Sequence, residues 1–205
     1  SAEFAANPLK VVRVDQGGLM FYGGLILALV TFLFWCRIKK EPVLPLADML
    51  AIVIPLGHAF GRVGCFFYGC CYGRLSECAL AVRFPRGSPA WYEQLNAGMI
   101  DSSAPAALAV LPTQLFEAAA CLAIFAGLFS WYAKRTATPR AERGGQFAGA
   151  YFMAYAVVRF AMEFLRGDPR AAVGPFSISQ TISMTLFAIG VALVAWSRRK
   201  TASSN

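Results

Sequence analysis

The stretch that decides the fold is residues 44–64, which read LPLADMLAIVIPLGHAFGRVG. It is apolar over about 20 residues, the length needed to cross roughly 30 Å of hydrocarbon. Its end carries His58 and, one helical turn later, Arg62. A charge is costly at membrane depth, so an arginine there indicates a functional site. The run therefore predicts a membrane helix that carries part of a site near one end.

The rest of the chain repeats this pattern. Of its 205 residues 58% are hydrophobic and only 15% are charged, which is too apolar for an ordinary soluble domain. We expect an all-α fold, a polytopic membrane helix bundle that forms a single integral membrane domain over residues 1–205. The five expected spans are residues 18–36, 44–64, 111–133, 146–165 and 178–196, with a long outer loop over 65–110.

The positive charge follows the predicted topology. The net charge is +8, and basic residues gather after the first, third and fifth spans, at 37–40, 134–143 and 198–200. Because cytoplasmic loops carry an excess of lysine and arginine, the loops 37–43 and 134–145 are predicted to be cytoplasmic. The loops 65–110 and 166–177 then face outward. The charge marks topology on this interpretation, and no nucleic-acid partner is expected.

Four of the six cysteines lie near the predicted outer face: Cys65, Cys70, Cys71 and Cys78. Oxidising conditions there permit a disulfide, and since neighbouring cysteines rarely bridge each other, Cys65 or Cys78 is the expected partner of the Cys70–Cys71 pair. A soft-metal or sulfur transporter that uses these thiols is an alternative. The spacing is not a CxxC pair, so no metal ligand is assigned.

Polar residues inside the other spans form a second pattern. Glu117 lies about one turn inside the third span, where capping of the helix start is the structural alternative to a site. Arg159 and Glu163 are four residues apart, so that an ion pair on one helix face is expected. Two deep arginines, Arg62 and Arg159, indicate a bound anion, for which a phosphate is the natural candidate because guanidinium donates to it in pairs. In a membrane that phosphate would belong to a lipid head group.

These residues together resemble the prolipoprotein diacylglyceryl transferase family. The matching motifs keep their order and spacing across nearly the whole chain: DQGGLMFYGGL at 15–25, GRVG at 61–64, PTQLFE at 112–117, RFAMEFLR at 159–166 and QTIS at 180–183. In the family two further helices precede a loop like residues 1–17. The first residues here show no signal-peptide pattern, and we expect either a shortened relative or a truncated sequence.

The resemblance implies an enzyme, a phosphatidylglycerol–prolipoprotein diacylglyceryl transferase of the bacterial plasma (inner) membrane. Such an enzyme moves a diacylglyceryl group from phosphatidylglycerol to the lipobox cysteine of a preprolipoprotein, forming a thioether as glycerol phosphate leaves. Its expected partners are phosphatidylglycerol, the preprolipoprotein signal peptide and membrane lipid. No cofactor is expected. A catalytically inactive paralogue that binds lipid is the other alternative.

The resemblance also implies roles for residues. Arg62 and Arg159 match arginines that hold the lipid head group and its leaving phosphate. Glu163 and Glu117 match family acids, the first expected to be catalytic and the second to bind substrate. Gly73 matches a glycine near the site.

Three family positions differ: Cys65 follows Gly64 where the family has asparagine, Cys70 occupies an acidic position, and the third lies in the first span. The family motif Phe-His-Gly-Gly reads Phe-Tyr-Gly-Gly here, with Tyr22 in place of the histidine. We expect His58 to act as the general base, since its ordinary pKa suits proton transfer near neutral pH. Tyr22 is expected to orient the lipid or relay a proton. Gly23, Gly24 and Gln114 are the remaining residues expected to bind substrate.

Overall fold

The computed structural model describes residues 20–136, 144–167, 172–173 and 176–202. These residues form six helices and one two-stranded hairpin: α2 (Met20–Lys39), α3 (Val43–Tyr68), α4 (Pro89–Asn96), α5 (Thr113–Thr136), α6 (Gln146–Glu163), β1 (Ala172–Val173), β2 (Phe176–Ser177) and α7 (Ile178–Ala202). Contacts divide the chain into two units, Ser1–Val43 and Leu44–Asn205. The hairpin and four isolated bridges are small departures from the predicted all-α fold.

The described part of the first unit is α2 and the turn after it. Exposed apolar side chains such as Ile26, Leu27 and Phe34 cover much of the helix. Lys40 has a φ of 57°, and the N–H of Glu41 donates to the Cys36 carbonyl at 2.9 Å. This left-handed turn ends the helix where the predicted cytoplasmic loop begins.

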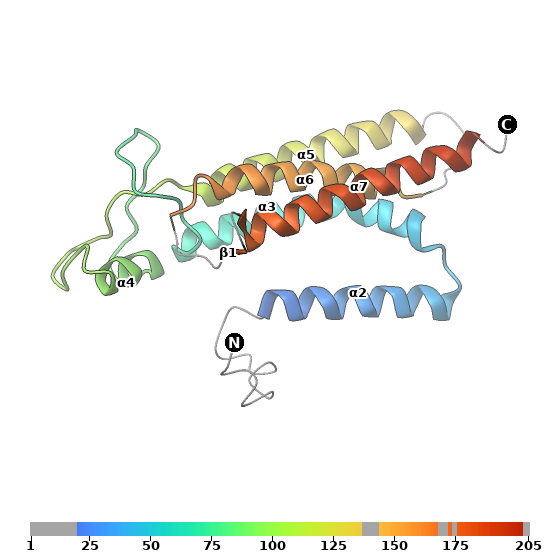
Figure 1. Ribbon diagram of the computed structural model, residues 1–205. Helices are drawn as coiled ribbons and strands as arrows, with labels where there is room; N and C mark the ends of the chain where they lie inside the picture. Colours follow the sequence, from blue (N-terminus) through green and yellow to red (C-terminus); the bar gives the residue numbers. More distant parts are fainter. Residues whose placement is uncertain (1–19, 137–143, 168–171, 174–175, 203–205) are drawn as a thin grey trace. The chain divides into compact units, whose positions relative to one another are not determined.

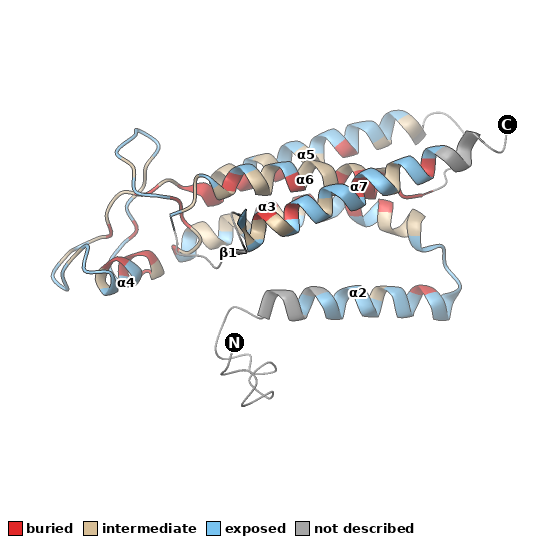
Figure 2. Cartoon of the chain, viewed as in Figure 1, coloured by how far each residue is buried: buried red, intermediate tan, exposed pale blue. Residues whose placement is uncertain are grey.

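The second unit is a bundle in which α3, α5, α6 and α7 lie side by side (Figure 1). Helix α6 packs against both α5 and α7. A buried cluster joins α3, α5 and α6 through Ile52, Leu128, Phe147 and Tyr151. Buried residues gather where helices face one another, and exposed residues cover the outer faces (Figure 2).

Helices α6 and α7 cross closely because each carries a glycine at the contact. A Cβ added at Gly149 would lie 2.7 Å from the Gly190 carbonyl oxygen, and a Cβ added at Gly190 would lie 2.7 Å from the Gly149 oxygen. Small residues allow this approach between membrane helices. The crossing brings the start of α7 beside the end of α6, where Arg159 lies.

The structure confirms a membrane protein that is mostly helical. Among the described residues, three helices are long and apolar enough to cross a bilayer: Val43–Tyr68, Thr113–Arg135 and Ile178–Arg198. Helices α2 and α6 occur at the first and fourth predicted spans but do not meet the same criterion over their described residues. The five-span topology therefore stays a prediction.

The loop over residues 65–110 has a small core of its own. Helix α4 packs its buried Trp91 with Tyr72, Phe84 and Val110, and the Trp91 indole N–H donates to the Ala104 carbonyl at 3.0 Å. Trp91 thus packs the loop. This loop and α4 lie beyond one end of the bundle (Figure 1).

Candidate active site

Arg62 is the centre of the site. It lies on α3, and its Nη2 is 3.0 Å from Oε1 of Glu117 on α5. Glu117 is only 1% exposed, so its charge needs a buried partner. The predicted substrate-binding acid is thus the counterion of the predicted phosphate-binding arginine.

His58 accepts a hydrogen bond from this arginine. The Nε of Arg62 donates to His58 Nε2 at 3.3 Å, as their spacing of four residues predicts. The same Nε2 lies 3.7 Å from Glu117 Oε1, too far for a hydrogen bond. Arginine can only donate, so Nε2 is the acceptor in this hydrogen bond.

Tyr155 of α6 completes this group. Its hydroxyl donates to Glu117 Oε1 at 3.3 Å, and its ring centroid lies 5.0 Å from that of His58. Three helices therefore contribute to one hydrogen-bonded cluster, α3, α5 and α6. Sequence reasoning missed Tyr155, although a tyrosine one turn before Arg159 on the same span was a usable signal.

Arg159 forms the predicted ion pair, with its Nη2 3.0 Å from Glu163 Oε2. The same Nη2 donates to the Ser179 hydroxyl in the first turn of α7 at 2.8 Å. Its other terminal nitrogen, Nη1, is buried and has no hydrogen-bond partner among the described residues. A buried guanidinium donor without an acceptor is costly, so this geometry favours an anionic ligand.

The start of α7 supports Arg159 through a capping box. The Ser177 hydroxyl accepts from the Gln180 N–H at 3.1 Å, and the Gln180 side chain accepts from the Ser177 N–H at 3.0 Å. This reciprocal pair determines where α7 begins and hence where Ser179 lies. Gln180 lies in one of the family motifs, and in the structure it caps the start of α7.

The start of α5 holds the turn that follows α3. The Thr113 hydroxyl donates to the Cys71 carbonyl at 3.0 Å, and the Gln114 side-chain amide donates to the Cys70 carbonyl at 2.7 Å. Gln114 Oε1 is buried without a hydrogen-bond partner in the described structure. The side-chain nitrogen of Gln114 therefore holds the turn after α3, and its side-chain oxygen can accept a hydrogen bond from a ligand.

Gly73 lies where three segments cross. A Cβ there would be 2.7 Å from the Leu165 carbonyl oxygen and 2.8 Å from Leu111 Cβ. Its N–H donates to the Leu111 carbonyl at 2.8 Å, and it forms a bridge with Arg166. Close packing alone explains why this position is glycine.

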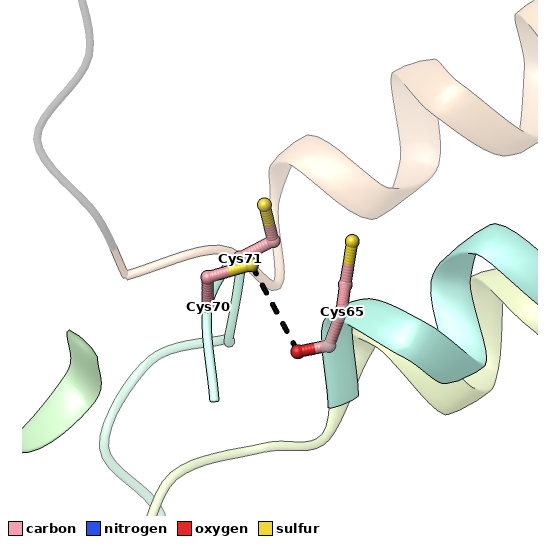
Figure 3. A group of neighbouring side chains, drawn as sticks. All are labelled: Cys65, Cys70 and Cys71. Atoms are coloured by element: carbon pink, nitrogen blue, oxygen red, sulfur yellow. Dashed lines mark hydrogen bonds between the residues drawn. The ribbon is translucent and has the colours of Figure 1, made fainter. Parts of the chain in front are cut away.

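Cys65, Cys70 and Cys71 lie together at the end of α3 (Figure 3). All six cysteines are free thiols, so the structure does not contain the expected disulfide. Burial, followed by the neighbouring Cys71 and Cys65 sulfurs, raises the pKa of Cys70 to about 12. Burial also acts to raise the pKa of Cys71, but the hydrogen bond and charge of Arg166 and the charge of Arg62 bring it below its usual value.

The predicted residues of α2 belong to the first unit of the chain. Tyr22 and Gly23 belong to the first turn of α2, and their side chains lie outside the described residues. Gly24 is exposed on the same helix. Their roles at the site therefore stay predictions.

Sequence reasoning also missed Asp48, a buried carboxylate inside the apolar run of α3. Its Oδ2 accepts from the Gly145 N–H at 2.8 Å and its Oδ1 from the Ala148 N–H at 2.7 Å. It thereby caps the start of α6 from another helix, beside Gly145, whose φ is +106°. An acid at membrane depth was the signal that marked it.

The sequence is similar to those of known proteins. A family model described as prolipoprotein diacylglyceryl transferase matches residues 2–196. The phosphatidylglycerol–prolipoprotein diacylglyceryl transferase of Xanthomonas oryzae pv. oryzae (strain PXO99A) is 36% identical, over 96% of this chain and 67% of that protein. Proteins of the same name from Pseudoalteromonas translucida and Clostridium tetani are 31% and 32% identical, over 96% and 90% of this chain and 66% of each relative.

The chain thus spans about two thirds of the length of these relatives. The match includes α2 to α6 in full and α7 as far as residue 196. Since the family model covers nearly the whole chain, the chain belongs to the prolipoprotein diacylglyceryl transferase family.

Proposed function

We propose that this chain transfers a diacylglyceryl group from phosphatidylglycerol to the lipobox cysteine of a preprolipoprotein. The names of its relatives support this reaction. The observation that carries it in this chain is Arg159, whose buried Nη1 has no acceptor among the described residues. The two alternatives, an inactive paralogue and a thiol-based transporter, gain no support from the comparisons.

The reaction exchanges one bond to the glyceryl carbon for another. The cysteine sulfur of the preprolipoprotein attacks that carbon, the bond from carbon to phosphate oxygen breaks, and glycerol phosphate leaves with the bond's electron pair. The thiol proton must go to a base, because only the thiolate attacks well. Charge therefore develops on the leaving phosphate while a proton is taken from sulfur.

Arg159 and Arg62 stabilise the leaving phosphate on this proposal. Both are cations in a largely buried site, where such charges act strongly on a developing anion. Arg159 is oriented by Glu163 and Ser179, which leave Nη1 for a phosphate oxygen. Glu163 thus has a positioning role beside the reacting atoms.

His58 is the proposed general base, and its geometry links the base to the phosphate. Its Nε2 lone pair accepts from Arg62 Nε in the described structure. When Arg62 turns its donors toward a phosphate, Nε2 becomes available to a thiol proton. Substrate binding then activates His58, because Arg62 leaves the His58 nitrogen when it binds the phosphate.

Four further residues are proposed for the lipid. Gln114 Oε1 is a buried open acceptor that suits a hydroxyl of the glycerol head group. Tyr22, Gly23 and Gly24 are proposed to approach the lipid from α2, with the tyrosine hydroxyl orienting it. Gly73 is proposed to lie near the site, where close packing requires a glycine.

The membrane arrangement is part of the proposal. Helices α2 and α6 are proposed to cross the bilayer together with the three more apolar helices, in one membrane domain over residues 1–205. Arg159 and Glu163 lower the hydropathy of α6, but paired charges facing other helices are typical of functional spans. The loops 65–110 and 166–177 then face outward from the bacterial inner membrane.

The test is incubation of the purified chain with labelled phosphatidylglycerol and a lipobox peptide, scored as thioether product. We expect product from the wild type and a loss on the order of 100- to 1,000-fold for R159A, since one charge-stabilising donor is worth about that much. R159K keeps the charge but not the paired donors, so it should recover only part of the rate. R83A, which removes an exposed arginine of the outer loop, is the matched control.

Two results would contradict the proposal. The first is an absence of product from the wild type with both substrates present. The second is an R159A rate equal to that of R83A. Full activity in H58Q would show that His58 is not the base. It would not contradict the proposed phosphate site.

A further inference from the structure

Three cysteine sulfurs converge at the outer end of α3. The Sγ atoms of Cys65, Cys70 and Cys71 all lie within 4.8 Å of one another. Figure 3 shows Cys65 on the last turns of α3 and the other two in the turn that follows. Each of the three is partly exposed, so a small ion can reach them.

The way α3 ends places the first two sulfurs. Gly69, with φ +81°, occupies the left-handed position of a Schellman motif, in which the Cys70 N–H donates to the Cys65 carbonyl at 3.2 Å. The Cys70 thiol also donates to this carbonyl at 3.8 Å. The helix end itself therefore stacks Cys70 over Cys65.

The position of the Cys71 sulfur depends on a strained backbone and on side chains of α5. Cys71 has a φ of +62°, which is uncommon for a residue other than glycine. Its carbonyl accepts from the Thr113 hydroxyl and that of Cys70 from the Gln114 amide. A strained backbone held by side chains of another helix is typical of sites that are organised before a ligand binds.

Positive charge lies beside the sulfurs. Arg166 hydrogen-bonds the Cys71 side chain, and Arg62 acts on both Cys71 and Cys65 through its charge. Two guanidinium groups therefore lie where they can balance the charge of thiolates formed when a cation binds. The three thiols have no role in the proposed phosphate site.

We infer that Cys65, Cys70 and Cys71 form a three-thiolate site for a soft monovalent cation of the copper(I) class. The three thiols release three protons to water and bind one Cu⁺, so that the cluster acquires a net charge of −2. Metal–sulfur bonds of about 2.3 Å in a trigonal arrangement require sulfurs about 4 Å apart, so only a small contraction is needed. Thiolate ligands select such soft ions.

The number of ligands favours copper(I) over zinc. Structural zinc sites are tetrahedral and use four protein ligands. In the described part of the chain this group holds three potential ligands and no fourth histidine, cysteine or acid. A trigonal set suits copper(I) without a further ligand.

The test titrates the reduced, detergent-solubilised chain with Cu(I) under anaerobic conditions, against a chromogenic Cu(I) chelator. We expect one Cu(I) for each chain, and three sulfur neighbours by X-ray absorption. C65S, C70S and C71S should each weaken binding by more than the 10- to 100-fold that follows loss of a supporting side chain. C78S, which changes an exposed cysteine outside the cluster, should bind like the wild type.

Three results would overturn the inference. One is equal copper binding by the wild type and by a variant in which all three cysteines are serine. Another is tighter binding of Zn²⁺ than of Cu(I). The third is a disulfide among the three cysteines in chain purified without reductant, seen as four reactive thiols in place of six.

Copper binding also has a consequence that rests on the proposed function. A cluster of charge −2 beside Arg62 competes with a phosphate for that guanidinium group. Cu(I) should therefore slow lipid transfer by the wild type and by C78S but not by C70S. If no variant transfers lipid, the proposed function fails while the copper titration still decides this inference.

Discussion

At the residue scale, one buried carboxylate joins side chains of several helices. Glu117 contacts Arg62 and Tyr155 from two other helices. The spacing within α3 predicted the contact between His58 and Arg62, because residues four apart share a helix face. The pairing across helices could not be predicted, since it depends on how α3, α5 and α6 pack.

Replacing Glu117 with glutamine should strongly destabilise the protein. The change keeps the volume but leaves Arg62 without its counterion, and breaking a largely buried pair costs on the order of 3 kcal/mol. Thermal unfolding in detergent measures the loss. E77Q changes an exposed acid of the outer loop and should unfold like the wild type, and equal midpoints for the two variants would contradict the role of Glu117.

The exposed Cys78 thiol should react at a lower pH than an ordinary cysteine. The Ser76 hydroxyl, followed by the Leu80 and Ala81 N–H groups, lowers the pKa of Cys78 by stabilising its thiolate. Since the thiolate is the reactive form, the alkylation rate should rise at a lower pH in the wild type than in S76A. Mass spectrometry of Cys78 alkylation against pH measures this, with S102A as control.

At the element scale, two helix ends carry a signal in the local sequence. Ser177 followed three residues later by Gln180 is a capping box, and Gly69 after an apolar run indicates a helix end. The cap of α6 was not predictable in the same way. Its acceptor is Asp48, which lies on another helix about 100 positions earlier.

Removing this cap should destabilise α6. D48A loses both accepting oxygens and is expected to cost about 2 kcal/mol, while D48N keeps one acceptor and should lose about half as much. Hydrogen exchange at the Gly145 and Ala148 amides measures the effect locally. Unchanged protection of both amides in D48A would contradict the capping role.

The crossing of α6 and α7 should not tolerate a methyl group. G149A brings a Cβ within 2.7 Å of the Gly190 carbonyl oxygen, and crowding of this kind costs roughly 1–3 kcal/mol. G127A is the matched control, because a Cβ there meets nothing within 4 Å and alanine favours the helix. Thermal unfolding should give a lower midpoint than the wild type for G149A and a slightly higher one for G127A.

At the scale of the whole molecule, the sequence was sufficient for the class of protein and for the positions of its long helices. Apolar length depends only on local composition, and helices appear at all five predicted spans. The sulfur cluster was the least predictable feature. It depends on a left-handed Cys71 and on side chains of α5, which no local pattern indicates.

The proposed topology predicts which loops a membrane-impermeant reagent can reach. A chain whose other cysteines are serine should be labelled at Cys78 from outside intact spheroplasts. The same chain with Cys78 replaced and K134C added should be labelled only after lysis, since basic loops remain in the cytoplasm. Labelling of both positions from outside would contradict the arrangement.

The contact between Asp48 and the start of α6 has a consequence for biogenesis. Chains are made from the N-terminus, so α3 leaves the ribosome about 100 residues before the Ala148 amide exists to receive its carboxylate. During that interval the insertion machinery, or water beside it, must solvate the acid. Synthesis arrested before Gly144 should therefore yield a chain that quality-control proteases remove, and completion of α6 is the step at which the bundle becomes stable in lipid.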